Sequence, residues 1–384
     1  MIHLTRPSFG EAEAAAVARV LASGMLIQGA EVLAFEEAVG RYLQALDAGA
    51  SPVHCVAVST GTTALELALG TRGRDGPAVG LGDEVLVPAV TWPSPGHAAL
   101  LRGATAVLVD VSPDTWCMDP RRAAEVLTPR TRALIPIDQF GVPADVAALR
   151  ALAGDVDLVE DSACALGSRV KGRACGLLGD VGVYSFHPRK VVTTGEGGML
   201  VTRDRARAEA FRMLRNHGQV SPGVFLEAGP NARLSELHAA LGVAQLAKLP
   251  ALLARRAQLA ARVKEGLALA WQAAPEGAEV NHQTLGFVLP QPPAGTRREA
   301  RDALVAALRA DGVEAGILSY GLHRLPQFAR YAVNATRRFP VADVVVDGGL
   351  ALPLHPGMSD ADADAVASAV RRHAGWALGR RVWQ

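Results

Sequence analysis

Apolar residues in the first half of the chain occur in short continuous runs, separated by stretches with helical spacing. The runs rich in β-branched residues cover 53–58, 84–87, 106–109, 133–137, 157–159 and 181–186, each bounded by Gly, Pro, Asp or Asn. Continuous apolar strands that alternate with helices are typical of a parallel or mixed sheet covered on both faces. We therefore expect an α/β fold in which ligands bind beyond the carboxyl ends of the strands.

The two ends of the chain show different patterns. Ser8-Phe9-Gly10-Glu11 has capping-box spacing and Gly24 stands where a glycine ends a helix, so we expect a helix between them. After residue 245 come long Ala/Leu/Arg helices, and then a strand at 284–289, a Pro-rich turn at 290–293, a helix at 297–311 and a strand at 313–318. We predict a large domain over 1–245 and a smaller α/β domain over 246–384.

Composition excludes several classes of function. The 384 residues are 49% hydrophobic with a formal net charge of +1, so no overall field attracts nucleic acid or an anionic membrane. About 18 apolar residues in a row, the length of a membrane span, occur nowhere, and the start of the chain lacks an apolar signal core. The four cysteines show no C-x-x-C spacing and no paired His cluster, so no metal site is expected. A cytoplasmic protein is the expectation.

Three segments carry candidate chemistry. The turn 59–63 joins a strand to a helix, a place where free N–H groups suit a phosphate, although Ser and Thr there also serve as plain N-caps. Glu160-Asp161 ends an apolar strand, where a carboxylate either meets a ligand or caps the next turn. Lys190 lies between Pro and Gly clusters, with His187 and Arg189 as positive neighbours that would lower its pKa; the alternative is a solvated loop lysine.

Segments along nearly the whole chain share a family resemblance. They are 23–29, 59–65, 87–92, Glu160-Asp161, 185–198, 229–236 and 352–357. In this order and spacing, the chain resembles the DegT/DnrJ/EryC1/StrS family of fold-type I pyridoxal-phosphate (PLP) aminotransferases, best known for sugar aminotransferases. The resemblance implies a large domain with a mixed or parallel sheet of the seven-stranded type and a smaller C-terminal α/β domain.

The resemblance also implies site residues. Lys190 would hold PLP as a Schiff base and, once freed by substrate, carry a proton between the substrate carbon and the cofactor's C4′. Asp161 would pair with the ring nitrogen and keep it protonated. Other roles would be stacking on the ring by Trp92, phosphate binding by Gly61, Thr62 and Ser185, and a contact from Asn231 of the neighbouring subunit, which implies a homodimer. Taken from the residues alone, Trp92 is also readable as a core aromatic and Asn231 as a turn residue.

The chain departs from the family pattern near the expected substrate. Many members read Glu-Asp-Ala-Ala-Gln where this chain has Glu160-Asp161-Ser162-Ala163-Cys164. The side chain near the cofactor's 3′-oxygen is then the thiol of Cys164 or another group, and Cys164 is alternatively a small buried apolar residue. Two prolines stiffen 92–95, and Ala232 replaces an aromatic residue. These departures leave the cofactor chemistry intact and affect the substrate.

The implied function is amino transfer from glutamate or glutamine to a keto-sugar, a nucleotide-linked keto-sugar or a cyclitol, in a cell-surface-sugar or secondary-metabolite pathway. Candidate substrate residues are Arg233, Tyr320, His323 and His355, although the 320–323 segment is also readable as packing at a domain junction. One alternative is a PLP-dependent dehydratase or aromatising enzyme. Another is a PLP-binding partner protein without turnover.

Overall fold

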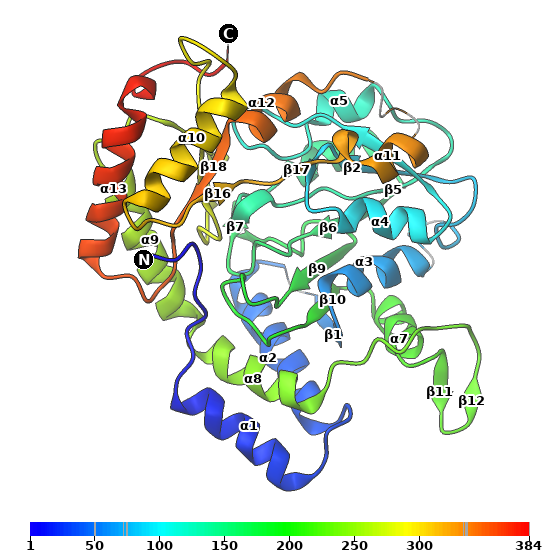
Figure 1. Ribbon diagram of the computed structural model, residues 1–384. Coiled ribbons are helices and arrows are strands. Elements are labelled where there is room, and N and C mark those ends of the chain that lie inside the picture. The colour runs from blue at the N-terminus through cyan, green and yellow to red at the C-terminus, as the bar shows by residue number, and fades with distance from the viewer. Residues whose placement is uncertain (50, 72, 74–75, 333, 335–336, 384) are drawn as a thin grey trace.

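The computed structural model describes residues 1–383 except 50, 72, 74, 75, 333, 335 and 336. A seven-stranded sheet forms its centre, in the order β1-β10-β9-β6-β5-β2-β4 (Figure 1). The strands are β1 (His54–Val58), β10 (Gly198–Thr202), β9 (Val181–Ser185), β6 (Asp157–Asp161), β5 (Thr131–Leu134), β2 (Glu84–Pro88) and β4 (Thr105–Val109). Pairing is parallel from β9 to β4, while β10 runs antiparallel to both β1 and β9. The expected mixed seven-stranded sheet is confirmed.

Six of the seven strands lie where the apolar runs predicted them, to within three residues at each end. The prediction missed β10, because its short apolar run directly follows Gly197 and reads as part of a glycine loop. The packing of β10 explains why glycine stands at its first position: a Cβ at Gly198 would lie 2.2 Å from the carbonyl oxygen of Thr60. The antiparallel strand therefore passes close to the turn after β1.

Helices cover both faces of this sheet. Successive residues of β1 point to opposite faces: Val56 and Val58 join one core with α3 (Gly61–Gly70), α4 (Ser94–Leu101) and α7 (Arg205–Leu214). Cys55 and Ala57 join another with α2 (Ala30–Leu46) and α8 (Glu236–Ala247). Under the other half of the sheet, α6 (Val146–Ala153) packs on β5 and β6, with α5 (Pro120–Ala124) beside it. The sheet is buried on both faces, as continuous apolar strands require.

A further core lies in the C-terminal part of the chain. An antiparallel sheet, β13 (Ala270–Trp271), β15 (Leu285–Val288), β18 (Gly349–Leu352) and β16 (Gly316–Ile317), packs with α9 (Leu249–Lys264), α10 (Arg297–Ala310) and α13 (Asp360–Ala374). Ile2 joins this core and bridges to Val313. In contrast, Leu322, Phe328 and Val345 pack into the core of the large sheet. The boundary at 245 stays a prediction, and the C-terminal part contributes to both cores.

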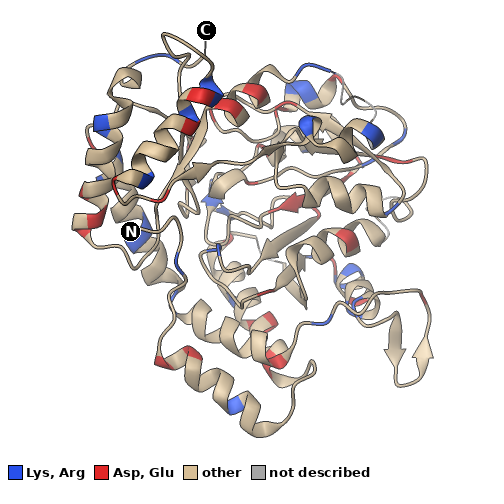
Figure 2. Cartoon of the chain, viewed as in Figure 1, with Lys and Arg blue, Asp and Glu red and all other residues tan. Residues whose placement is uncertain are grey.

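Apart from the N-terminal helix, the remaining elements are short. They are the strand pair β3 (Val90–Thr91) and β17 (Tyr320–Gly321), the sheet β14 (Ala278–Glu279), β7 (Arg169–Val170) and β8 (Arg173–Ala174), the hairpin β11 (Gln219–Ser221) and β12 (Val224–Phe225), the helices α11 (Pro326–Tyr331) and α12 (Pro340–Gly348), and the 3-10 helices η1 (Gln139–Gly141), η2 (Leu322–Arg324) and η3 (Gly375–Ala377). The hairpin projects away from the body of the molecule (Figure 1). Basic and acidic residues are interspersed along the same elements (Figure 2).

The N-terminal helix begins later than its expected cap. It is α1 (Glu11–Ser23), with Gly10 at the N-cap, the Gly10 N–H donating to Glu13 Oε2 at 2.8 Å and Gly24 at the C-cap. The expected capping role of Ser8 is wrong, because Gly10 occupies the N-cap two residues later; the carbonyl oxygen of Ser8 accepts from Gln245 and Lys248 of the α8–α9 corner. Among the described residues no single helix would cross a membrane; α8 and α9 together have the length and composition but bend by 60° at their junction.

Candidate functional site

Three strands end at the same edge of the large sheet. Because β10 is antiparallel to both β1 and β9, and β6 is parallel to β9, the carboxyl ends of β1, β9 and β6 meet there. These ends carry the turn after Val58, Ser185 and Asp161. Segments that are far apart in the sequence therefore supply one crevice, as expected for a sheet of this kind.

The turn after β1 forms a helix start against Ser185. Thr60 caps α3 by accepting from the N–H of Thr63 at 3.1 Å, which leaves the N–H groups of Gly61 and Thr62 outside the helical ladder. A Cβ at Gly61 would lie 2.9 Å from the Cβ of Ser185, so the two backbones approach closely. The hydroxyl of Thr62 is 2.7 Å from that of Ser94 on α4. Free N–H groups at a helix start beside two hydroxyl residues suit a phosphate.

Lys190 lies in a loop whose shape is set by its own backbone. The Lys190 N–H donates to the carbonyl of His187 at 2.8 Å, and both Thr193 Oγ1 and the Thr194 N–H donate to the carbonyl of Phe186. The ammonium group donates to Cys164 Sγ at 3.0 Å. Both side chains are partly exposed. Lys190 is therefore not a freely solvated lysine, and Cys164 is not a buried apolar filler.

A short segment from the C-terminal half holds both partners of this contact. Asn281 Nδ2 donates to the carbonyl of Cys164 at 2.9 Å, and Gln283 Nε2 donates to that of Arg189 at 2.5 Å. Buried Arg256 in turn donates to the carbonyls of residues 282 and 283, and burial lowers its pKa to about 10. Sequence reasoning missed all three residues, because nothing local marks a side chain that supports another loop.

Asp161 is buried at the end of β6. Its Oδ1 accepts from the N–H of Ala163 at 3.0 Å. Burial raises the pKa of Asp161, while that N–H bond and the nearby charge of Lys190 act to lower it. A buried carboxylate is stabilised by a cationic group beside it, so Asp161 suits a ligand that carries a positive charge.

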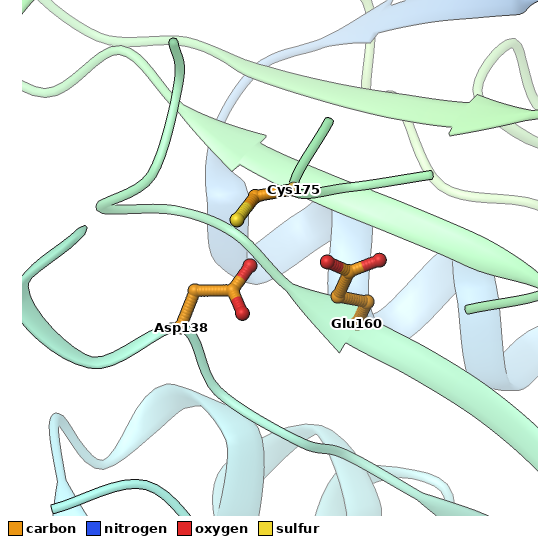
Figure 3. A group of neighbouring side chains, drawn as sticks. All are labelled: Asp138, Glu160 and Cys175. Atoms are coloured by element: carbon orange, nitrogen blue, oxygen red, sulfur yellow. The ribbon is translucent and has the colours of Figure 1, made fainter. Parts of the chain in front are cut away.

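Behind Asp161 lies a buried acidic pair that the sequence did not predict. Asp138, Glu160 and Cys175 have ligand atoms within 4.8 Å of one another (Figure 3). Glu160 accepts N–H bonds from Gly176, Leu178 and Gly179, and Asp138 accepts from Ala144 and Ser162. Burial, and then the charge of Glu160, raise the pKa of Asp138 well above its usual value. Since each carboxyl oxygen already has a donor, we attribute the cluster to a proton held by Asp138 between the two acids.

Trp92 is 60% exposed, which excludes the reading as a core aromatic. Its ring meets Tyr320 edge-on, with centroids 5.6 Å apart. The pairing of Tyr320 with Thr91, in β17 and β3, holds the two rings together. Of the candidate substrate residues, Tyr320 is thus the neighbour of Trp92.

The other candidate residues are in different surroundings. Arg233 bridges to Val58 at the end of β1 and donates to Asn216, while exposed Asn231 bridges to Asn216 at the base of the hairpin. His323 Nε2 is 2.9 Å from Asp343, and its ring packs on Phe339, which favours the packing role left open for the 320–323 segment.

His355 is buried and lines a small cavity together with Lys190, Arg189 and Arg256. Burial, and then the charges of Arg256 and Arg6, lower the pKa of His355. The imidazole is therefore neutral near neutral pH in a basic surrounding. Its role toward a substrate stays a prediction.

A family model and several solved structures match this chain over nearly its whole length. The family model described as the DegT/DnrJ/EryC1/StrS aminotransferase family matches residues 7–371. The aminotransferase TlmJ from Streptoalloteichus hindustanus is 34% identical, with 98% of this chain and 99% of that chain covered and a TM-score of 0.87. The structure of 3-amino-5-hydroxybenzoic acid synthase is 31% identical, with 97% and 98% covered and a TM-score of 0.87. The PLP form of Streptococcus pneumoniae Spr1654, described as a sugar aminotransferase, is 26% identical, with 98% and 99% covered and a TM-score of 0.86.

Proposed function

The chain belongs to the DegT/DnrJ/EryC1/StrS aminotransferase family and is a PLP-dependent aminotransferase, and from this premise we propose which groups it acts on. We propose transfer of an amino group from glutamate or glutamine to a keto-sugar, a nucleotide-linked keto-sugar or a cyclitol, in a cell-surface-sugar or secondary-metabolite pathway. One geometric relationship supports the catalytic assignment: the Lys190 amine lies against Cys164, three positions after the buried Asp161 that ends β6.

The residues at this edge fit the cofactor. The N–H groups of Gly61 and Thr62 and the hydroxyl of Ser185 would hold its phosphate, since Gly61 at the start of α3 lies directly against Ser185. Asp161 would face the ring nitrogen, and exposed Trp92 would cover one face of the ring. Cys164, beside Lys190, would lie near the reactive end of the cofactor.

When bound, PLP supplies an electron sink for the bonds of the substrate's amino-bearing carbon. Asp161 would keep the ring nitrogen protonated, because a negative carboxylate in a buried site strongly favours a neighbouring cation. Lys190 would move a proton between the substrate carbon and the cofactor's C4′. The loop from 186 to 197, closed on itself by the bonds to Phe186, would hold the amine in place for this transfer.

Substrate contacts are assigned from position. Tyr320, which packs on Trp92, and His355, which lines a small cavity with Lys190, would contact a substrate, and Arg233 would supply a positive charge near the end of β1. A guanidinium group forms bidentate hydrogen bonds with carboxylates and phosphates. Arg233 would therefore suit the carboxylate of an amino-acid donor or the phosphate of a nucleotide-linked acceptor. We place the enzyme in the cytoplasm, because its four cysteines are unpaired, as reducing conditions require.

We further propose a homodimer in which Asn231 contacts the cofactor of the partner subunit. The projecting hairpin exposes Val220, Val224, Phe225 and Leu226, all at least 45% accessible, and Asn231 lies at its base. Apolar side chains exposed together on a projecting hairpin favour burial against another chain.

Mixing two inactive variants tests the assignment of Asn231. If Asn231 acts across the interface, a heterodimer of Lys190→Ala and Asn231→Ala subunits contains one intact site, and random mixing restores about a quarter of the wild-type activity. No restoration after verified subunit exchange would place Asn231 in the site of its own chain.

The visible spectrum tests the reaction. Adding L-glutamate or L-glutamine to the purified protein should convert the absorbance of the lysine-bound aldehyde form of the cofactor into that of its amine form. Lys190→Ala should abolish turnover while retaining some cofactor without a covalent bond. Normal activity in that variant would contradict the assignment.

The alternative is a dehydratase or aromatising enzyme of the same family. Its support is the similarity to 3-amino-5-hydroxybenzoic acid synthase, whose product is aromatic. Incubation with an amino donor and a panel of keto-sugars separates the two reactions, because only a transaminase releases the oxo-acid in step with product. A partner protein without turnover would show no spectral change with any donor.

A further inference from the structure

We propose that Cys164 and Lys190 form a covalent S–N crosslink when a peroxide reaches the site while the lysine amine is free. The amine and the sulfur lie 3.0 Å apart. All four cysteines fall in the described part of the chain; Cys55, Cys117 and Cys175 are buried, whereas Cys164 is partly exposed. Cys164 is thus the thiol that a small oxidant in the crevice meets, and Lys190 is the nucleophile next to it.

The contact is held from both sides by the segment 281–283. Asn281 holds the carbonyl of Cys164, Gln283 holds that of Arg189, and the Gln283 N–H donates to Asn281 Oδ1 at 2.9 Å. The same short segment therefore fixes both backbones relative to each other. Two reacting groups held in this way behave as if at very high concentration, so the intramolecular reaction competes well with further oxidation.

The chemistry needs one equivalent of hydrogen peroxide and no other reagent. The Cys164 sulfur attacks the peroxide, the O–O bond breaks, and sulfenic acid and water form. The Lys190 amine, in its neutral form, then attacks the sulfur; the S–O bond breaks, the N–S bond forms, and the hydroxyl leaves as a second water with the proton from nitrogen. The protein loses two hydrogens in total, and sulfur is oxidised while peroxide is reduced.

The consequence for activity rests on the proposed function. An amine bonded to sulfur is unable to hold PLP, so the crosslink would switch the enzyme off until a thiol reduces it. Conversely, bound PLP occupies the amine and would protect it. The crosslink would therefore form in protein whose Lys190 is free of cofactor. It would not form in protein saturated with PLP.

Peptide mass spectrometry of the full-length protein tests the proposal. One sample is saturated with PLP, and another is freed of cofactor with hydroxylamine and dialysed; both receive hydrogen peroxide, then iodoacetamide and trypsin. The expected product joins peptide 151–169 to peptide 190–203 and is lighter than their sum by two hydrogens, or about 2 Da. Dithiothreitol should release both peptides.

Variants sharpen the test. Cys164→Ser should lose the crosslink, Cys55→Ala should retain it, and Gln283→Ala should lower its yield several-fold by releasing the lysine loop. Recovery of Cys164 unoxidised, or as sulfinic or sulfonic acid with Lys190 unmodified, would overturn the proposal. Equal crosslinking with and without PLP would uphold it and instead contradict the cofactor role of Lys190.

Discussion

Gly61 faces Ser185 so closely that a Cβ on the glycine would lie 2.9 Å from the Cβ of the serine. This approach brings the start of α3 against the end of β9 at the proposed phosphate site. The first prediction is that Gly61→Ala pushes these elements apart, costs about 1–3 kcal/mol of stability as overpacking does, and weakens PLP binding. Fluorescence titration with PLP and urea unfolding measure both effects.

Gly80→Ala is the matched control for that substitution. The space around Gly80 holds no atom within 4 Å of the added carbon, so both cofactor affinity and stability should stay at wild-type values. Wild-type PLP affinity in Gly61→Ala would show that the phosphate binds elsewhere.

Two tryptophans should respond in opposite ways to truncation. Trp92 is 60% exposed and Trp116 is 1% exposed, so Trp92→Ala removes little packing while Trp116→Ala opens a cavity. We expect Trp92→Ala to weaken PLP binding about 10-fold through lost stacking, with little loss of stability. Trp116→Ala should cost about 3–5 kcal/mol. Unchanged PLP affinity in Trp92→Ala would rule out stacking.

Replacing Asp161 by Asn should separate stability from activity. The amide keeps the bond to the Ala163 N–H but carries no charge, so the ring nitrogen loses its partner and kcat should fall about 100-fold or more. The exposed Asp155→Asn is the control. Unchanged kinetics in Asp161→Asn would show that another group holds the nitrogen.

The stability of that variant should depend on pH. Burial raises the pKa of Asp161, so the folded state favours the protonated carboxyl group. The contribution of this group to the free energy of unfolding is fully present below its unfolded pKa and is lost as pH rises through its folded pKa. Asn is neutral at every pH and has no such loss. Without cofactor, Asp161→Asn should therefore gain stability relative to the wild type as pH rises, and a constant difference would contradict the raised pKa.

The Asp138–Glu160 pair gives a second pH-dependent prediction. The raised pKa of Asp138 means that the folded state holds a proton that the unfolded state releases. The stabilisation of the folded state by this proton is lost as pH rises through the folded pKa of Asp138. Asp138→Asn keeps an acceptor for the Ala144 N–H and supplies a permanent donor toward Glu160. The free energy of unfolding, measured in urea at about pH 6 and about pH 9, should fall less with pH in this variant than in the wild type.

Glu160→Gln is the contrasting variant at the same pair. Its amide would turn a donor toward one or more of the three N–H groups that Glu160 now accepts, at a cost of about 2–4 kcal/mol. Equal effects of the two substitutions would refute the assignment of the proton to Asp138.

Much of the fold could be predicted because its signals are local. Each strand of the large sheet except β10 is an apolar run between turn residues, and Gly24 ends α1 as expected. The failures were also local. Ser8 has the spacing of a cap but its carbonyl is bound by the α8–α9 corner, and β10 is hidden by the glycines that let it pass close to Thr60.

The amino-acid sequence by itself determined the family, the order of strands and turns, and the chemical groups at the strand ends, including Asp161 and Lys190. Only the tertiary structure decided what those groups touch: the thiol of Cys164 beside the lysine amine, the support by Asn281 and Gln283, and the buried Asp138–Glu160 pair behind Asp161. The reason is physical. Periodicity and turn residues act between near neighbours in the sequence. These contacts join residues from 22 to 117 positions apart, and only the folded backbone brings them close together.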